Sequence, residues 1–134
     1  MAFWLLKSDP SSYAFADLRR DGRTRWDGVT NPQALGHIRS MAVGDRIAVY
    51  HSGDREVVGL ARVARAASPD RPSAEREIVD VEAAGPLASP VPLEALKGEG
   101  AFASSPLLRQ GRLSVVPLTA AQWKAILRLG ATRP

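Results

Sequence analysis

The stretch GDRIAVYHSGDREVVGLARVARA, residues 44–66, decides how this chain folds. Two runs of alternating apolar residues flank the Ser-Gly-Asp tripeptide at 52–54, a combination typical of a tight turn between two strands. The pattern predicts an antiparallel β-hairpin. Gly59 interrupts the second run, and it predicts either a bulge or the close approach of another group to the backbone.

Other elements follow on both sides of the hairpin. Asn31 and Pro32 have the residue types that cap and open a helix, and Thr119 with Gln122 forms a capping-box pattern. Ser12 is the expected cap of an earlier helix. The stretch 24–34 neither alternates like a strand nor repeats every three to four residues like a helix, and its part before Asn31, which contains Trp26, is expected to be a loop. Beyond the hairpin, strands are predicted at 2–7, 76–87 and 111–118, and helices at 12–22, 31–41, 92–98 and 119–130.

These elements predict the fold class. About five to six strands and three to four short helices occur without strict βα alternation, which favours an α+β, mainly β protein. We expect a small, mostly antiparallel β-barrel, closed or half-closed, with helices on its outside and end. The 134 residues fit a single domain spanning 1–134.

Composition narrows the functional classes. The chain has no cysteine and two histidines, and no metal-ligand spacing appears, so neither a disulfide framework nor a metal site is expected. No apolar run is long enough to cross a membrane. The apolar run after Met1 is too short for a secretion signal, which predicts a cytoplasmic protein.

The charge is carried by arginine. The formal charge is +4, with fifteen arginines against three lysines, and residues 19–25 hold four arginines and one aspartate. A basic surface favours nucleic acid as a partner. A genome rich in G and C is an alternative source of the same arginine-rich composition.

The sequence offers a binding pocket more readily than an assembled catalytic site. It contains no phosphate-binding glycine loop and no Gly-x-Ser-x-Gly motif. His51 and Ser52 are adjacent on a strand and point to opposite faces. Donors or flat rings gather instead at three chain reversals: 7–8, 26–31 and 50–52. Trp26 there is either a core residue or a platform for a ligand, whereas Trp4, Trp123 and Tyr50 are expected in the core.

Five blocks of the sequence form a recognisable set: WLLKSDP (4–10), WDGVTNPQA (26–34), VGDRIAVYHS (43–52), VVGLARV (57–63) and RQGRLSVVPLT (109–119). In this order, and over nearly the whole chain, they resemble the EVE domain family. The family usually has Glu where this chain has Asp9, and more polar residues where it has Thr30, Leu35 and Gly36.

The resemblance implies a PUA-like fold, kinship with YTH domains and a non-catalytic role as a reader of modified bases. The bases would be 5-methylcytosine or related DNA bases, or modified RNA bases, and no cofactor is implied. A flipped base would stack on Trp26. The expected base-binding residues are Lys7, Ser8, Trp26, Val29, Asn31, Tyr50, His51, Ser52, Gln110 and Ser114. The expected phosphate-binding residues are Arg19, Arg20, Arg23, Arg25, Arg109 and Arg112.

The residues are also compatible with two other functions. Lys7, Tyr50 and His51 could serve a nuclease or another nucleic-acid hydrolase as a charge stabiliser and an acid–base group. The pocket could also take a small nucleoside-like molecule. Membrane and metal partners are not expected, and the sequence does not identify a protein partner.

Overall fold

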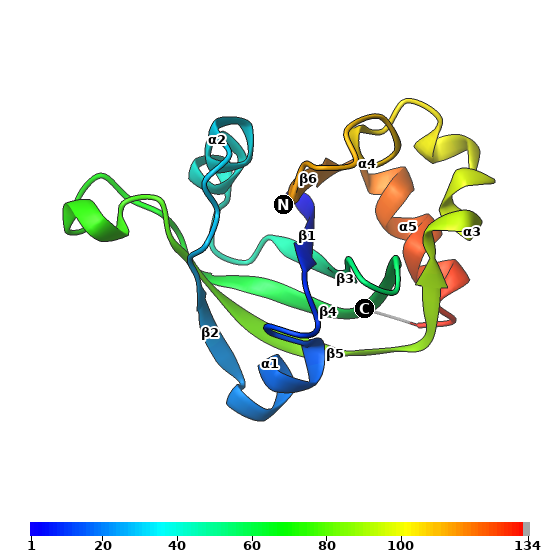
Figure 1. Ribbon diagram of the computed structural model, residues 1–134, viewed down its shortest axis with the longest axis horizontal. Coiled ribbons are helices and arrows are strands. Elements are labelled where there is room, and N and C mark those ends of the chain that lie inside the picture. Colours follow the sequence, from blue (N-terminus) through cyan, green and yellow to red (C-terminus); the bar gives the residue numbers. More distant parts are fainter. Residues whose placement is uncertain (133–134) are drawn as a thin grey trace.

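Six strands form one curled, mixed sheet in the order β2-β5-β4-β3-β1-β6 (Figure 1). The computed structural model describes residues 1–132, so the last two residues of the predicted domain lie outside it. Neighbouring strands run antiparallel except β1 and β3, which are parallel, with Lys7 opposite Tyr50 and Ser8 opposite His51. The strands are β1 (Phe3–Ser8), β2 (Arg23–Trp26), β3 (Arg46–His51), β4 (Glu56–Arg65), β5 (Val79–Pro92) and β6 (Val115–Leu118).

Short helices flank this sheet, and the predicted α+β class with a PUA-like half-barrel is confirmed. The described residues contain five α-helices, more than the three to four expected. In Figure 1, α1 lies near β2, whereas α3, α4 and α5 gather at the opposite side of the sheet. The helices are α1 (Phe15–Asp21), α2 (Pro32–Ser40), α3 (Leu93–Lys97), α4 (Pro106–Arg109) and α5 (Ala120–Leu129), with 3-10 turns at Ser73–Glu75 and Gly100–Phe102.

Strands β3 and β4 form the predicted hairpin. Gly59 of β4 allows α1 to pack closely against this hairpin. A Cβ built on Gly59 would lie 2.3 Å from the ring of Phe15, far inside van der Waals contact. The register of β4 also shifts near this residue. Both expectations for Gly59, a strand irregularity and a close approach to the backbone, are therefore confirmed.

Two predicted helix starts are also confirmed. The Asn31 side chain accepts a hydrogen bond from Ala34 N at 3.0 Å. Thr119 and Gln122 each accept a hydrogen bond from the other's backbone, which completes the capping box. The expected cap at Ser12 is wrong, because α1 begins later, with Ala14 as its N-cap residue.

The expected loop around Trp26 is wrong at its start. Residues 23–26 form strand β2, which pairs with β5 and places Trp26 opposite Val79. The bounds of the strand predicted at 76–87 are also wrong, because β5 begins at Val79 and continues to Pro92. Proline has no backbone N–H to donate to a neighbouring strand, which normally ends a strand. Here the register of β5 against β4 shifts at several points, and the pairing of the two strands continues beyond each shift.

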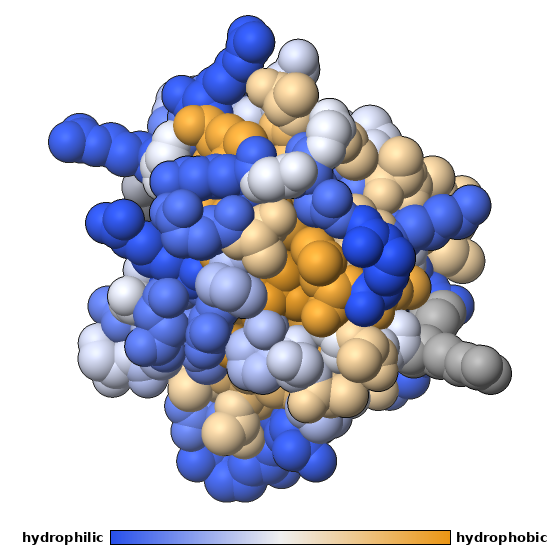
Figure 2. Space-filling view, turned by 90° about the vertical axis from the view of Figure 1, so that its right-hand side faces the viewer, coloured by the Kyte–Doolittle hydropathy of each residue, from blue (hydrophilic) through white to orange (hydrophobic). Residues whose placement is uncertain are grey.

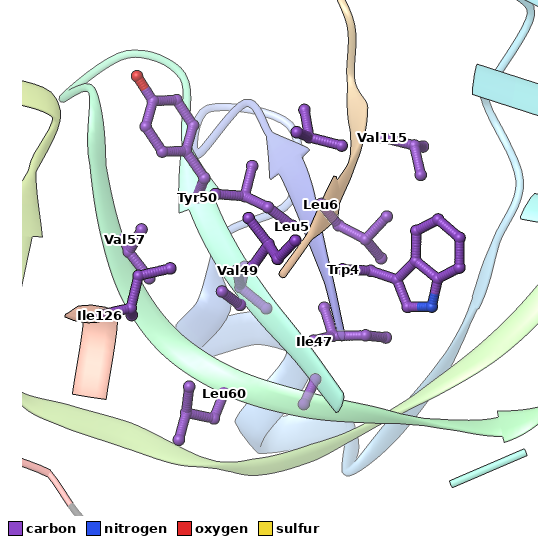
Figure 3. Close-up of a cluster of buried hydrophobic side chains, with 14 of the residues drawn as sticks. Trp4, Leu5, Leu6, Ile47, Val49, Tyr50, Val57, Leu60, Val115 and Ile126 are labelled. Carbon is purple, nitrogen blue, oxygen red and sulfur yellow. The ribbon is translucent and has the colours of Figure 1, made fainter. Parts of the chain in front are cut away.

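The core lies inside the curled sheet (Figure 3). Trp4, Trp123 and Tyr50 are buried, as predicted. Asp45 anchors the start of β1 to the turn before β3: its carboxylate accepts hydrogen bonds from Trp4 Nε1 at 3.0 Å, Ala2 N at 3.1 Å and Ala42 N at 2.9 Å. Burial acts to raise the pKa of this carboxyl, but the hydrogen bonds outweigh it and lower the pKa.

The face toward the viewer in Figure 2 carries hydrophilic side chains around its outline and a hydrophobic area near its middle. Between residues 1 and 132, the helices are all too short or too polar to cross a membrane.

Candidate functional site

A cavity of about 560 Å³ opens beside Trp26. Four segments that are far apart in the sequence surround it: the end of β1, the turn before α1, strand β2 with its following loop, and the residue before β6. The lining residues are Lys7, Ser8, Asp9, Ser12, Tyr13, residues 24–29 and Ser114.

Strand alternation explains why Trp26 reaches this cavity. Thr24 and Trp26 are half-buried on one face of β2, and both line the cavity, whereas Arg23 and Arg25 alternate with them and are exposed. Arg25 also borders the cavity, but Arg23 does not. The indole of Trp26 packs against the core and also borders the hollow. Trp26 is therefore held by the protein without being sealed by it, which leaves aromatic surface available to a ligand.

Hydrogen bonds fix the wall next to Trp26. The Ser8 hydroxyl donates to the backbone oxygen of Tyr13, and His51 Nε2 accepts from Phe15 N at 3.0 Å. Ser8 and His51 are neighbours on parallel strands, so together they hold residues 13–15 against the sheet. His51 thereby has a structural partner and does not line the cavity.

Lys7 stands between this cavity and a second one. Its Nζ donates to Gly111 O at 2.8 Å and lies 5.6 Å from the centre of the Tyr50 ring. Partial burial lowers the pKa of the Lys7 ammonium. The second cavity has a volume of about 410 Å³, and Tyr50 and Ser52 line it rather than the hollow beside Trp26.

The predicted base-binding residues thus fall into three groups. Those that line the Trp26 cavity are Lys7, Ser8, Trp26, Val29 and Ser114. Tyr50 and Ser52 line the neighbouring cavity, as does Lys7. Asn31, His51 and Gln110 line neither: Asn31 caps α2, His51 binds Phe15, and Gln110 is exposed at the end of α4.

The predicted phosphate-binding arginines fall into two groups, those that pair with an acidic side chain and those that do not. Arg20 pairs with Asp17 and Asp21 at 3.1 Å, Arg23 with Asp80 at 3.0 Å, and Arg25 with Glu75 at 2.8 Å. Arg19, Arg109 and Arg112 are exposed, and the structure shows no ion pair for them within residues 1–132. These three have the charge that is most available to an external phosphate.

Tyr13, Thr24 and Asp27 line the Trp26 cavity but were not among the predicted site residues. The Tyr13 hydroxyl donates to Asp21 at 2.8 Å, and burial is the main cause that raises the pKa of Tyr13. The spacing of Thr24 and Trp26 would have placed both on one face, had residues 23–26 been recognised as a strand.

Charged groups of both signs surround the Trp26 cavity. Lys7 and Arg25 supply positive charge, and Asp9 and Asp27 supply carboxylates. Hydrogen bonds from the side chain and backbone of Ser11 lower the pKa of Asp9. No group of three or more histidine or acidic side chains in the described part of the chain could hold a metal ion.

This arrangement of sheet and flanking helices is shared with solved structures. An NMR structure of Rpa0253 from Rhodopseudomonas palustris is 38% identical, with a TM-score of 0.88, over 98% of this chain and 94% of that one. Human THYN1, solved in complex with 5-methylcytosine-containing DNA, is 26% identical with a TM-score of 0.86 and full coverage of both chains. The YTH domain of Zygosaccharomyces rouxii MRB1, with 14% identity and a TM-score of 0.63, shares the fold.

Sequence comparison leads to the family. The EVE domain model matches residues 2–129, and this chain belongs to the EVE domain family. Thymocyte nuclear protein 1 of Mus musculus is 31% identical over 169 residues, covering 98% of this chain and 75% of the relative. The human relative of the same name is 29% identical over similar shares.

Proposed function

We propose that this protein is a non-catalytic reader of modified nucleobases, which takes a flipped base into the cavity beside Trp26. The observation that carries the proposal is the half-buried indole bordering a hollow of about 560 Å³. The human relative solved with 5-methylcytosine-containing DNA supports the same ligand class, and 5-methylcytosine is the first base to test.

Stacking and hydrogen bonding would divide the work of recognition. Stacking of a base on an aromatic ring contributes about 1–3 kcal/mol and is tolerant of base identity. Identity must come from polar groups that meet the edge of the base. Ser8, Thr24, Asp27 and Ser114 are of the right size and chemistry, and the cavity brings them together with Trp26.

Burial of one methyl group contributes about 0.8 kcal/mol, which is a several-fold preference. A reader therefore gains strong discrimination only when the unmodified base leaves a void or a poorly bonded water. Flipping a base out of a duplex costs a few kcal/mol. Contacts from Arg19, Arg109 and Arg112 to phosphates would offset part of that cost, and they would make binding sensitive to salt.

The hydrolase alternative is less well supported than the reader. It needs His51 as an acid–base group near Lys7 and Tyr50, but His51 Nε2 accepts a hydrogen bond from Phe15 N. His51 also lies outside both cavities, whereas Tyr50 lies in the second one. We propose that the protein has no catalytic activity and that it acts in the cytoplasm.

The test is binding of matched oligonucleotides that differ only in one base modification. Trp26→Ala should lose most of the affinity and the preference for the modified base, and Trp26→Phe should retain part of both because phenylalanine still stacks. Thermal unfolding of each variant provides the control for folding. Unchanged binding by a folded Trp26→Ala variant would contradict the proposed function, because the base would then not depend on Trp26.

A further inference from the structure

We propose that the second cavity, which shares Lys7 with the Trp26 cavity, is a phosphate-binding subsite for the strand that carries the flipped base. This inference rests on the proposed function and adds to it a place for the backbone of the ligand. The cavity has a volume of about 410 Å³ and is built from the β3–β4 hairpin, helices α3 and α4, and Lys7 of β1. Its occupant would be a phosphate group, either in a strand or on a free nucleotide.

The charge of the second cavity is of one sign. Lys7, Arg55 and Lys97 line it, and no carboxylate does. Lys97 pairs with Glu94 at 3.1 Å, but Glu94 is 82% exposed and its contact with Lys97 is readily exchanged. Three cations around one hollow, with the Ser52 hydroxyl beside them, provide the donors that a phosphate accepts.

The cavity beside Trp26 differs in chemistry. It contains two carboxylates as well as cations, so it suits the mixed donors and acceptors of a base edge better than a phosphate. The second cavity lacks an indole, and its apolar wall consists of leucines and the Tyr50 ring. Figure 3 shows the Tyr50 hydroxyl turned away from the aliphatic cluster around Val49. The two hollows therefore match the two parts of a nucleotide strand.

Lys7 joins the two hollows. It lines both, and Gly111 O holds its ammonium at 2.8 Å. A base beside Trp26 and a phosphate of the same strand would thus both lie within reach of Lys7. Loss of the Lys7 charge would affect both parts of the ligand, so Lys7 is unsuitable for testing the subsite alone.

Arg55 is positioned by its backbone. It has φ of 56°, in the left-handed region that non-glycine residues seldom adopt. Two hydrogen bonds hold it there: its N–H donates to His51 O at 2.8 Å, and its carbonyl accepts from Leu93 N at 2.8 Å. Arg55 is thereby fixed where the hairpin meets α3, at the rim of the second cavity.

The test uses the double variant Arg55→Asn/Lys97→Gln. Asparagine tolerates the left-handed conformation, so the change removes charge without adding backbone strain. The matched control is Arg65→Asn/Lys124→Gln, which removes the same charges at exposed positions outside both cavities. Single-stranded oligonucleotides with one modified base are measured at several salt concentrations, and each phosphate flanking that base is replaced in turn by a neutral methylphosphonate.

We expect the double variant to lose about tenfold in affinity at low salt, and its salt dependence to become shallower by about 0.7 on a log–log scale, the value for one phosphate contact on a single strand. The ratio of affinities for modified and plain base should stay the same. One methylphosphonate should weaken binding by the unmodified protein but not by the double variant. A methylphosphonate effect of equal size in both proteins, or equal losses in the control and double variants, would overturn the subsite.

Two further arms separate the remaining outcomes. Binding of the modified nucleoside, its 5′-monophosphate and the oligonucleotide is compared to distinguish the sources of phosphate. If the monophosphate loses affinity in the double variant while the nucleoside and the oligonucleotide do not, the subsite serves a free nucleotide. Failure of the reader proposal would appear separately, as equal affinity of the unmodified protein for modified and plain oligonucleotides, and the phosphate effect would still be measurable on the plain strand.

Discussion

The ring of Phe15 lies directly against the backbone of Gly59, where a Cβ would come within 2.3 Å of it. Phe15 opens α1 and is buried, and its N–H donates to His51. This contact seats α1 on β4 and so positions Tyr13, two residues earlier, at the wall of the Trp26 cavity. The absence of a side chain at Gly59 is therefore a requirement of the site as well as of the core.

Gly59→Ala should destabilise the protein by about 1–3 kcal/mol, because the added methyl group forces Phe15 out of its place. Chemical denaturation measures the free energy of unfolding. Gly100→Ala is the control, since a Cβ there meets nothing within 4 Å. The double variant Gly59→Ala/Phe15→Leu should be more stable than the sum of the single changes predicts, and strict additivity would contradict the proposed clash.

Asp45→Asn should destabilise the protein by about 1–3 kcal/mol at neutral pH, because an amide cannot accept from three donors as the carboxylate does. The folded pKa of Asp45 lies below its ordinary value. The stabilisation is therefore complete above the unfolded pKa of about 3.9 and is lost as pH falls through the lower folded pKa. The difference in unfolding free energy between Asp45→Asn and the unmodified protein should shrink over that acidic range, and a constant difference would contradict the assignment.

His51→Ala should lower stability by about 1 kcal/mol, since Phe15 N loses its acceptor, without changing the preference for a modified base. Thermal unfolding and oligonucleotide binding are measured on the same preparation. Loss of base preference at unchanged stability would instead indicate that His51 contacts the base, as the resemblance to the EVE domain family implies.

We expect the arginines of residues 19–25 and 109–112 to have two different roles, one in stability and one in nucleic-acid binding. Arg23→Gln should cost about 1 kcal/mol in stability, because Asp80 is buried and loses its cation. Arg109→Gln and Arg112→Gln should leave stability nearly unchanged and make nucleic-acid binding less dependent on salt. Salt titrations of all three variants check this division, and equal salt dependence throughout would contradict it.

Local signals explain most of what could be predicted from the sequence. The β3–β4 hairpin, the Asn31 cap and the capping box at Thr119 depend on residues close together in the chain, and all three were predicted correctly. Strand β2 was missed because it has four residues and forms only through pairing with β5. The extent of β5 was missed because its prolines normally end a strand.

The site was predicted in part for the same reason. The sequence identified Lys7, Ser8 and Trp26, and the fold places all three at one cavity. It could not show that Tyr50 and Ser52 face a different hollow from Ser8, because that depends on the parallel register of β1 and β3. Tyr13 was missed because its place depends on the packing of Phe15 against Gly59.

The open ends of the sheet are poor templates for further strands. At one end β2 has only four residues, two of them exposed arginines engaged with acidic partners. At the other end β6 contains Pro117, which lacks an amide hydrogen. Short length, charge and proline are the features by which proteins discourage strand-by-strand aggregation. A half-closed barrel with both borders blunted in this way can stay dispersed at high concentration without completing its ring.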